Sequence, residues 1–127
     1  MTGSGLKEVI FSIGSNCGDR EANVREGIDW LKGILLDPSS SGIYATPDCH
    51  GGQREYINAV VKGMSTQSID EMESRCKTFE LEHGRTPEAR AAGNVPVDID
   101  IVVFDGNTVR TKDFASSFFR IGYDSLR

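Results

Sequence analysis

The stretch Pro96-Val97-Asp98-Ile99-Asp100-Ile101-Val102-Val103-Phe104 is apolar apart from its proline and two aspartates. Its β-branched and aromatic residues are typical of a buried β-strand. Successive side chains of a strand point to opposite faces, so Asp98 and Asp100 share one face, with Cβ atoms roughly 6–7 Å apart. The strand therefore holds two carboxylates rigidly side by side.

Two interpretations of this pair are open. Carboxylates at this spacing suit a hard divalent cation, and Mg²⁺ is often bound by one or two carboxylates together with substrate phosphates. Alternatively, inward-facing charges on an edge strand protect a sheet against aggregation. The apolar residues on both sides of the pair favour the metal site, because an unpaired buried charge is costly or takes up a proton.

The residues before this strand predict three more strands and two helices. Strands are expected over residues 9–13, 41–46 and 56–62. One helix is expected from the N-cap Asp19 to Gly33, and another from the Ser68–Glu71 capping box to Gly84. The order β-α-β-β-α-β predicts an α+β, ferredoxin-like sandwich. A turn at Gly106-Asn107 adds a C-terminal hairpin.

The remaining segments are expected to be irregular. Residues 1–7 are interpreted as a flexible arm, and residues 85–94 as a polar loop rich in small side chains. Residues 114–127 show no clear pattern and are treated as a divergent tail. The 127 residues suit one domain with a substantial core.

Composition restricts the classes of partner. The net charge of −5 argues against non-specific nucleic-acid binding. No apolar stretch approaches the length of a membrane span, and the N-terminus lacks the apolar core of a signal peptide. Three widely spaced cysteines (Cys17, Cys49, Cys76) make a disulfide framework improbable. A cytoplasmic location is expected.

Several polar residues are candidates for chemistry. Gly14–Gly18 follows a strand and precedes a helix, which fits either an anion-holding loop or a tight turn. Arg85 and Arg90 flank the loop that leads to the aspartates, and mobile cations beside a carboxylate pair suit phosphoryl transfer; the alternative is a solvated surface loop. Asn58 stands on an apolar strand, as a recognition amide or a satisfied strand-end residue.

Five motifs follow one another between roughly residues 8 and 106: Ile13-Gly14-Ser15-Asn16-Cys17-Gly18-Asp19-Arg20 with Asn23, Tyr44-Ala45-Thr46-Pro47, Tyr56-Ile57-Asn58-Ala59-Val60-Val61, Glu80-Leu81-Glu82-His83-Gly84-Arg85 and Asp98-Ile99-Asp100-Ile101. In this order they resemble the 6-hydroxymethyl-7,8-dihydropterin pyrophosphokinase family of folate biosynthesis. The resemblance implies transfer of pyrophosphate from ATP to the hydroxymethyl group of a reduced pterin.

The resemblance also implies roles for single residues. Asp98 and Asp100 would coordinate two Mg²⁺ ions that bridge the ATP phosphates. Asn58 would pair with the polar edge of the pterin beside Tyr56, helped by backbone groups around Thr46 and Pro47. A nucleotide-binding group would comprise the residues at the end of the second helix and in the loop after it: Glu80, Arg85 and Arg90.

The chain also departs from the family pattern. The family's loop before the last core strand usually reads Arg-Trp-Gly-Pro-Arg, whereas here the matching residues are Ala91-Ala92-Gly93-Asn94-Val95. Ala92 therefore stands at the position of the aromatic lid and Val95 at that of an arginine. The family's later Pro-His segment is absent, and Arg120 with Phe118 or Phe119 are the candidates to replace its arginine and aromatic residue.

Three functions remain open. The first is a working, Mg²⁺-dependent pyrophosphokinase that is a shortened and divergent family member. The second is a degenerate member that binds a pterin or nucleotide without transferring pyrophosphate. The third is a scaffold that self-associates through surfaces that a longer tail would cover. The retained aspartates favour the first or second, and Ala92, Val95 and the short tail favour the second or third.

Overall fold

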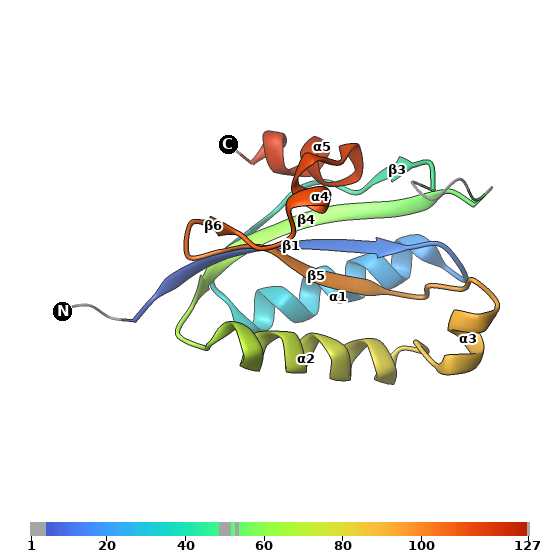
Figure 1. Ribbon diagram of the computed structural model, residues 1–127, viewed down its shortest axis with the longest axis horizontal. Coiled ribbons are helices and arrows are strands. Elements are labelled where there is room, and N and C mark those ends of the chain that lie inside the picture. Colours follow the sequence, from blue (N-terminus) through green and yellow to red (C-terminus); the bar gives the residue numbers. More distant parts are fainter. Residues whose placement is uncertain (1–4, 49–51, 53, 127) are drawn as a thin grey trace.

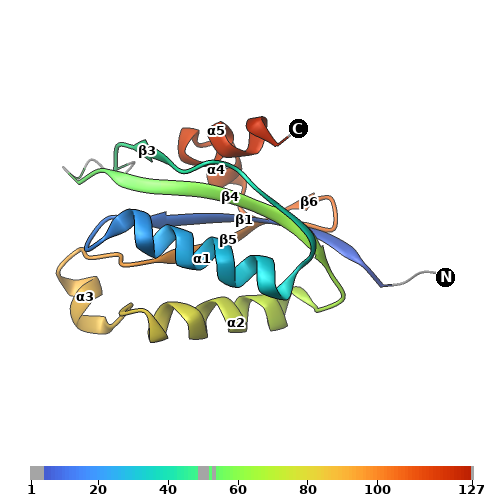
Figure 2. The same cartoon turned by 180° about the vertical axis from the view of Figure 1, so that it is seen from behind.

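The computed structural model describes residues 5–48, 52 and 54–126 of the chain. It contains an antiparallel six-stranded sheet with helices on both faces (Figures 1 and 2). The elements, in chain order, are β1 (Lys7–Ser15), α1 (Arg20–Ile34), β2 (Leu36–Ser40), β3 (Tyr44–Thr46), β4 (Tyr56–Ser65), α2 (Ile69–Glu82), α3 (Pro87–Ala91), β5 (Asp98–Phe104), β6 (Asn107–Thr108), α4 (Thr111–Ala115) and α5 (Ser117–Ser125).

The sheet has the strand order β2-β4-β1-β5-β6, and the short β3 also pairs with β4. This is the topology of the β-α-β-β-α-β arrangement with an added hairpin, so the expected ferredoxin-like α+β fold is confirmed. The central strand β1 brings the other two long strands together. Its residue Ser12 lies opposite Val60 of β4 and Asp100 of β5.

The helices α1 and α2 cover one face of the sheet (Figure 1). Both begin as predicted: Asp19 accepts a hydrogen bond from the backbone N–H of Ala22, and Ser68 and Glu71 form the reciprocal capping box. The first core lies beneath them. It is formed by alternate residues of β1, β4 and β5 together with the apolar stripes of the helices: Val9, Phe11, Ile13, Val24, Leu31, Ala59, Val61, Met72, Cys76, Phe79, Ile99 and Ile101.

The helices α4 and α5 cover part of the opposite face (Figures 1 and 2). A second, smaller core lies between them and the sheet: Ile10, Val60, Val102, Val103 and Phe119. Phe119 is fully buried there and packs against Tyr123, with ring centroids 5.3 Å apart. The treatment of residues 114–127 as a segment without pattern is therefore wrong for the helical residues. The spacing of Phe119, Tyr123 and Leu126 is the helical signal in it.

The strand expected over residues 41–46 is only partly correct. Tyr44–Thr46 is a strand, but β2 precedes it and was not expected. Pro38 and the left-handed Asp37 (φ 50°) interrupt β2, so its sequence lacks the usual signature of a strand. Ser41 connects the two short strands to β4, since its Oγ accepts from the backbone N–H of Val60 at 2.9 Å.

Two further expectations are corrected. Residues 85–94 contain the helix α3, because Thr86 caps it by accepting from Ala89 N at 3.1 Å and Pro87 suits the first turn. Lys7, which was expected in an arm over residues 1–7, is instead the first residue of β1; residues 1–4 lie outside the described part. Cys17 and Cys76 are free thiols, and Cys49 lies outside the described residues. Within the described ranges, every helix is too short or too polar to cross a bilayer.

Replacing Phe119 with alanine should show whether α5 is part of the cooperative fold. A fully buried aromatic side chain that is truncated costs about 3–5 kcal/mol of unfolding free energy. Ile121→Ala is the matched control, because Ile121 lies on the same helix with 50% of its surface exposed. Urea denaturation should show a large loss for Phe119→Ala and a small one for Ile121→Ala. Equal small losses would mean that α5 is not docked in solution.

Candidate functional site

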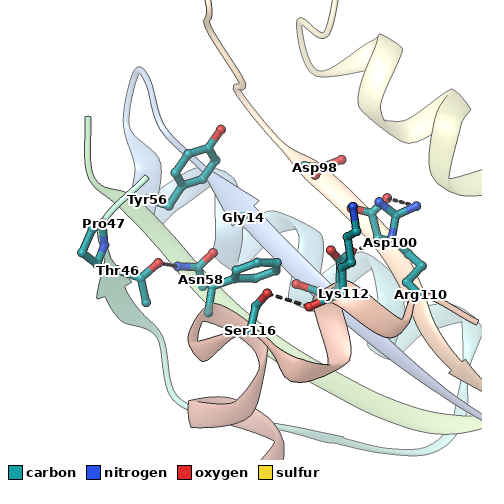
Figure 3. Close-up of a pocket in the computed structure, with 13 residues that line it drawn as sticks. Gly14, Thr46, Pro47, Tyr56, Asn58, Asp98, Asp100, Arg110, Lys112 and Ser116 are labelled. Atoms are coloured by element: carbon teal, nitrogen blue, oxygen red, sulfur yellow. Dashed lines mark hydrogen bonds and ion pairs between the residues drawn. The ribbon is translucent and has the colours of Figure 1, made fainter. Parts of the chain in front are cut away.

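A cavity of about 360 Å³ lies on the face of the sheet that α4 and α5 partly cover (Figure 3). Its floor comes from β1, β4 and β5, and its walls come from β3 and from the segment after β6. The residues that line it are Ser12, Gly14, Thr46, Pro47, Tyr56, Asn58, Asp98, Asp100, Arg110, Lys112, Asp113, Ser116 and Phe118.

Strand alternation produces the polar floor. On β5, Ile99 and Ile101 enter the first core while Asp98 and Asp100 face the cavity. On β4, Asn58 faces the cavity between two residues of that core, Ile57 and Ala59. The buried Asn58 amide is held in place because its Nδ2 donates to Thr46 Oγ1 at 2.6 Å (Figure 3).

Two arginines lie beside the aspartates. Arg85 Nη1 donates to Asp98 Oδ1 at 2.7 Å, and Arg110 Nη1 lies 3.9 Å from Asp100 Oδ1. The second guanidinium is also held by Asp113, whose Oδ2 accepts from Arg110 Nε at 2.5 Å. Arg85 Nε is buried and has no hydrogen-bond partner among the described residues. Both arginines therefore balance the carboxylates and retain capacity to bind an anion.

Burial and mutual repulsion divide the protons unequally between the two carboxylates. Burial raises the pKa of Asp100 to about 8, and the charge and hydrogen bond of Asp98 add to the effect. Burial acts on the pKa of Asp98 in the same direction, but hydrogen bonds from Asp100 and Arg85, with the Arg85 charge, lower it below its usual range. The pair thus holds one proton near neutral pH and carries about one negative charge.

Glu80 supports the strand from the other face of the sheet. Its Oε2 accepts a hydrogen bond from the backbone N–H of Ile99 at 2.8 Å, and its Oε1 lies 3.6 Å from Arg85 Nη1. Over this half, β5 has only β1 as a paired neighbour, so the Glu80 carboxylate covers an otherwise open strand edge. Burial raises the pKa of Glu80, although the hydrogen bond from Ile99 opposes the shift.

The structure brings most of the predicted site residues together. Six of them line the cavity: Thr46, Pro47, Tyr56, Asn58, Asp98 and Asp100. Arg85 joins them through its ion pair with Asp98, whereas Glu80 binds the backbone N–H of Ile99 and is not among the described residues that line the cavity. Arg90 is exposed on α3 and is not among the described residues that line the cavity. Of the three tail residues considered as replacements, Phe118 faces the cavity, Phe119 is buried in the second core and Arg120 packs over Phe114 and Tyr123.

Sequence reasoning missed the cations on the far wall. Arg110 and Lys112 line the cavity because the chain folds back after β6: the backbone N–H groups of Val109 and Arg110 donate to Val102 O at 2.8 and 3.4 Å. The sequence did contain a signal for this wall, because the alternate basic residues Arg110 and Lys112 follow the predicted hairpin directly. Ser12 and Gly14 were missed as floor residues, although strand alternation from Ile13 would have placed them on the face opposite the core.

The aspartate pair fits a magnesium ion only in part. Among the described residues, no group of three or more His, Cys, Asp or Glu side chains is arranged to hold a metal. Two carboxylates do not complete a coordination shell, but Mg²⁺ commonly takes one or two carboxylates and fills the rest with water and phosphate oxygens. A cation would also replace the proton on Asp100. The donor set therefore fits Mg²⁺ that arrives with a phosphate-bearing substrate.

Comparison with known proteins identifies a family and several relatives. The family model described as 7,8-dihydro-6-hydroxymethylpterin-pyrophosphokinase matches residues 10–121. A mitochondrial folate synthesis bifunctional protein of Arabidopsis thaliana is 34% identical over 99 residues, which are 76% of this chain and 18% of that protein. A 2-amino-4-hydroxy-6-hydroxymethyldihydropteridine pyrophosphokinase of Bacillus subtilis is 30% identical over 105 residues, 80% of this chain and 62% of its own length. The chain thus spans less than two thirds of the relatives that it matches.

Asp100→Asn should stabilise the fold at high pH. The folded-state pKa of Asp100 is raised to about 8 from an ordinary value of 3.8, so the folded state binds the extra proton between these values. The stability due to this proton is complete below pH 4 and is lost as pH rises toward 8. Asn keeps a neutral side chain, so the variant should gain on the order of 1–3 kcal/mol over the parent at pH 8.

The measurement is urea denaturation in EDTA at pH 5 and pH 8. Asp29→Asn, on the exposed face of α1, is the control and should retain the parent's pH profile. If Asp100→Asn is no more stable than the parent at pH 8, the two carboxylates do not share a proton as described.

Proposed function

The chain belongs to the 7,8-dihydro-6-hydroxymethylpterin-pyrophosphokinase family, and we propose that it catalyses Mg²⁺-dependent transfer of pyrophosphate from ATP to 6-hydroxymethyl-7,8-dihydropterin. One observation carries the proposal. A single cavity combines a buried amide and aromatic rings at one end with a carboxylate pair and two cations at the other. These are the groups that a flat polar heterocycle and a metal–triphosphate need, respectively.

The heterocycle is proposed to lie near Asn58. The buried Asn58 amide can donate and accept hydrogen bonds, and Thr46 fixes the orientation of that amide. Tyr56 and Phe118 supply aromatic surface on the cavity wall. A site whose buried amide must be satisfied discriminates strongly against ligands that cannot pair with it.

The phosphates are proposed to lie between the aspartates and the basic residues. Asp98 and Asp100 would hold two Mg²⁺ ions, and these ions would neutralise phosphate charge and help to orient the reacting groups. Arg85, paired with Asp98, would supply positive charge on one side, and Arg110 and Lys112 on the cavity wall would supply it on the other. Phosphoryl transfer depends mainly on such positioning and charge stabilisation.

A second candidate function is binding without transfer. Ala92 and Val95 supply neither an aromatic lid nor a phosphate-binding arginine. The segment that carries them is also fixed to the loop after β1, because Asn16 Nδ2 donates to Gly93 O at 3.0 Å and Val95 N donates to Asn16 Oδ1 at 2.7 Å. A loop held in this way favours a binding protein if the reaction requires that loop to move.

A coupled assay for AMP release tests the two functions. ATP, Mg²⁺ and 6-hydroxymethyl-7,8-dihydropterin should give pterin-dependent AMP, and Asp98→Ala with Asp100→Ala should lower the rate by a factor of about 10³ or more. Asp29→Ala is the control. If the parent chain releases no AMP but binds both ligands in calorimetry, the transfer function is refuted and binding without transfer is supported. Full activity in the double variant would refute the metal assignment.

Arg110→Ala should weaken the nucleotide step alone. Loss of a charge-assisted contact to phosphate is expected to lower kcat/KM for ATP by about 10- to 100-fold. Arg110→Lys should restore part of it, because the charge remains. Arg75→Ala is the matched control, since Arg75 is exposed on α2 and binds Gln67. An unchanged kcat/KM in Arg110→Ala would remove Arg110 from the phosphate site.

A further inference from the structure

The side chain of Tyr44 joins one wall of the cavity to the other. The hydroxyl of Tyr44, on β3, donates to the backbone carbonyl of Phe118 at 2.6 Å and accepts from the backbone N–H of Gly122 at 3.2 Å. Phe118 lines the cavity, and the ribbon views place β3, at the edge of the sheet, near α5 (Figures 1 and 2).

The position of this hydroxyl within α5 is unusual. Phe118 O and Gly122 N are four residues apart, which makes them the acceptor and donor of one regular helical turn. The Tyr44 hydroxyl hydrogen-bonds to both groups, so it is held against the first turn of the helix. The orientation of the first turn of α5 therefore depends on Tyr44.

Residue 122 is compatible with this contact only as glycine. A Cβ built there would lie 2.8 Å from the Tyr44 hydroxyl and 2.6 Å from Val60 Cγ2. The absence of a side chain allows both the hydroxyl and β4 to approach the helix. The contact is also independent of pH over the working range, because burial raises the pKa of Tyr44 to about 12, despite the opposing hydrogen bond from Gly122.

The other end of β3 reaches the floor of the cavity. Thr46 is two residues from Tyr44, and its Oγ1 accepts from the Asn58 amide. A strand of three residues therefore connects Asn58 at the floor to the backbone of Phe118 at the wall. Because Tyr44 also pairs with Asn58 in the sheet, the distance between Asn58 and the Phe118 backbone can vary little.

We propose that Tyr44 is a positioning residue that sets the distance of the Phe118 ring from the Asn58 floor, and thereby the width of the slot for a flat heterocycle. The inference rests on the proposed function for the nature of the heterocycle. It assigns to Tyr44 a role in selectivity for that ligand and none in binding the nucleotide. The role operates through Phe118, without contact between Tyr44 and the substrate.

The test is a double-mutant cycle on Tyr44→Phe and Phe118→Ala, with Tyr123→Phe as the matched control on the same helix. Dissociation constants for 6-hydroxymethylpterin and for Mg²⁺ with α,β-methylene-ATP are measured by calorimetry. Tyr44→Phe should weaken pterin binding about fivefold, the loss typical of one hydrogen bond, and Phe118→Ala about tenfold. The double variant should be no weaker than Phe118→Ala, and nucleotide binding should be unchanged in all variants.

Several results would overturn the proposal. Additive losses would show that Tyr44 does not act through Phe118. Equal losses for pterin and nucleotide, or the same loss in Tyr123→Phe, would show a general effect on folding. Phe118→Ala leaves the main-chain contact of Tyr44 available, so unchanged pterin binding in that variant would also refute it. A parent chain that binds no pterin contradicts the proposed function itself, whereas normal binding in Tyr44→Phe contradicts only the role of Tyr44.

Discussion

The two faces of the three long strands carry different chemistry, and every other feature of the molecule depends on that division. Each strand alternates with a period of two, so a residue committed to the core fixes its neighbours on the opposite face. Ile99 and Ile101 are buried beneath α1 and α2, and the aspartates must then face the other side. A shift of one residue in register would bury both charges. The hydrophobic effect therefore positions the carboxylates.

The charges around the cavity are arranged so that no carboxylate depends on solvent alone. Asp98 is paired with Arg85, and Asp100 holds a proton and faces Arg110. Of the charged residues that line the cavity, three are acidic and two are basic. A triphosphate would add several negative charges to this set, which only additional cations can balance. The charge balance therefore supports the proposal that Mg²⁺ accompanies the phosphates.

Local signals in the sequence predicted the elements whose neighbours in the chain determine them. The Ser68–Glu71 capping box and the period-two pattern at Asp98 are examples. The missed features depend on contacts between distant segments. β2 is held by pairing with β4 in spite of Pro38, and Arg110 reaches the cavity because the chain folds back onto Val102. The choice of Phe118 over Phe119 for the cavity follows from the rotation of α5, which the distant Tyr44 contacts.

If Asp98 holds the proposed Mg²⁺, Arg85 and the metal ion would compete for the same carboxylate. In this structure the Arg85 guanidinium donates a hydrogen bond to Asp98 Oδ1 at 2.7 Å, while Arg85 Nε has no partner among the described residues. A metal at Asp98 must displace part of this ion pair, which leaves a largely buried guanidinium in need of an anion. A nucleotide phosphate meets that need. Metal and nucleotide should therefore bind cooperatively, and by linkage each raises the affinity of the other by the same factor.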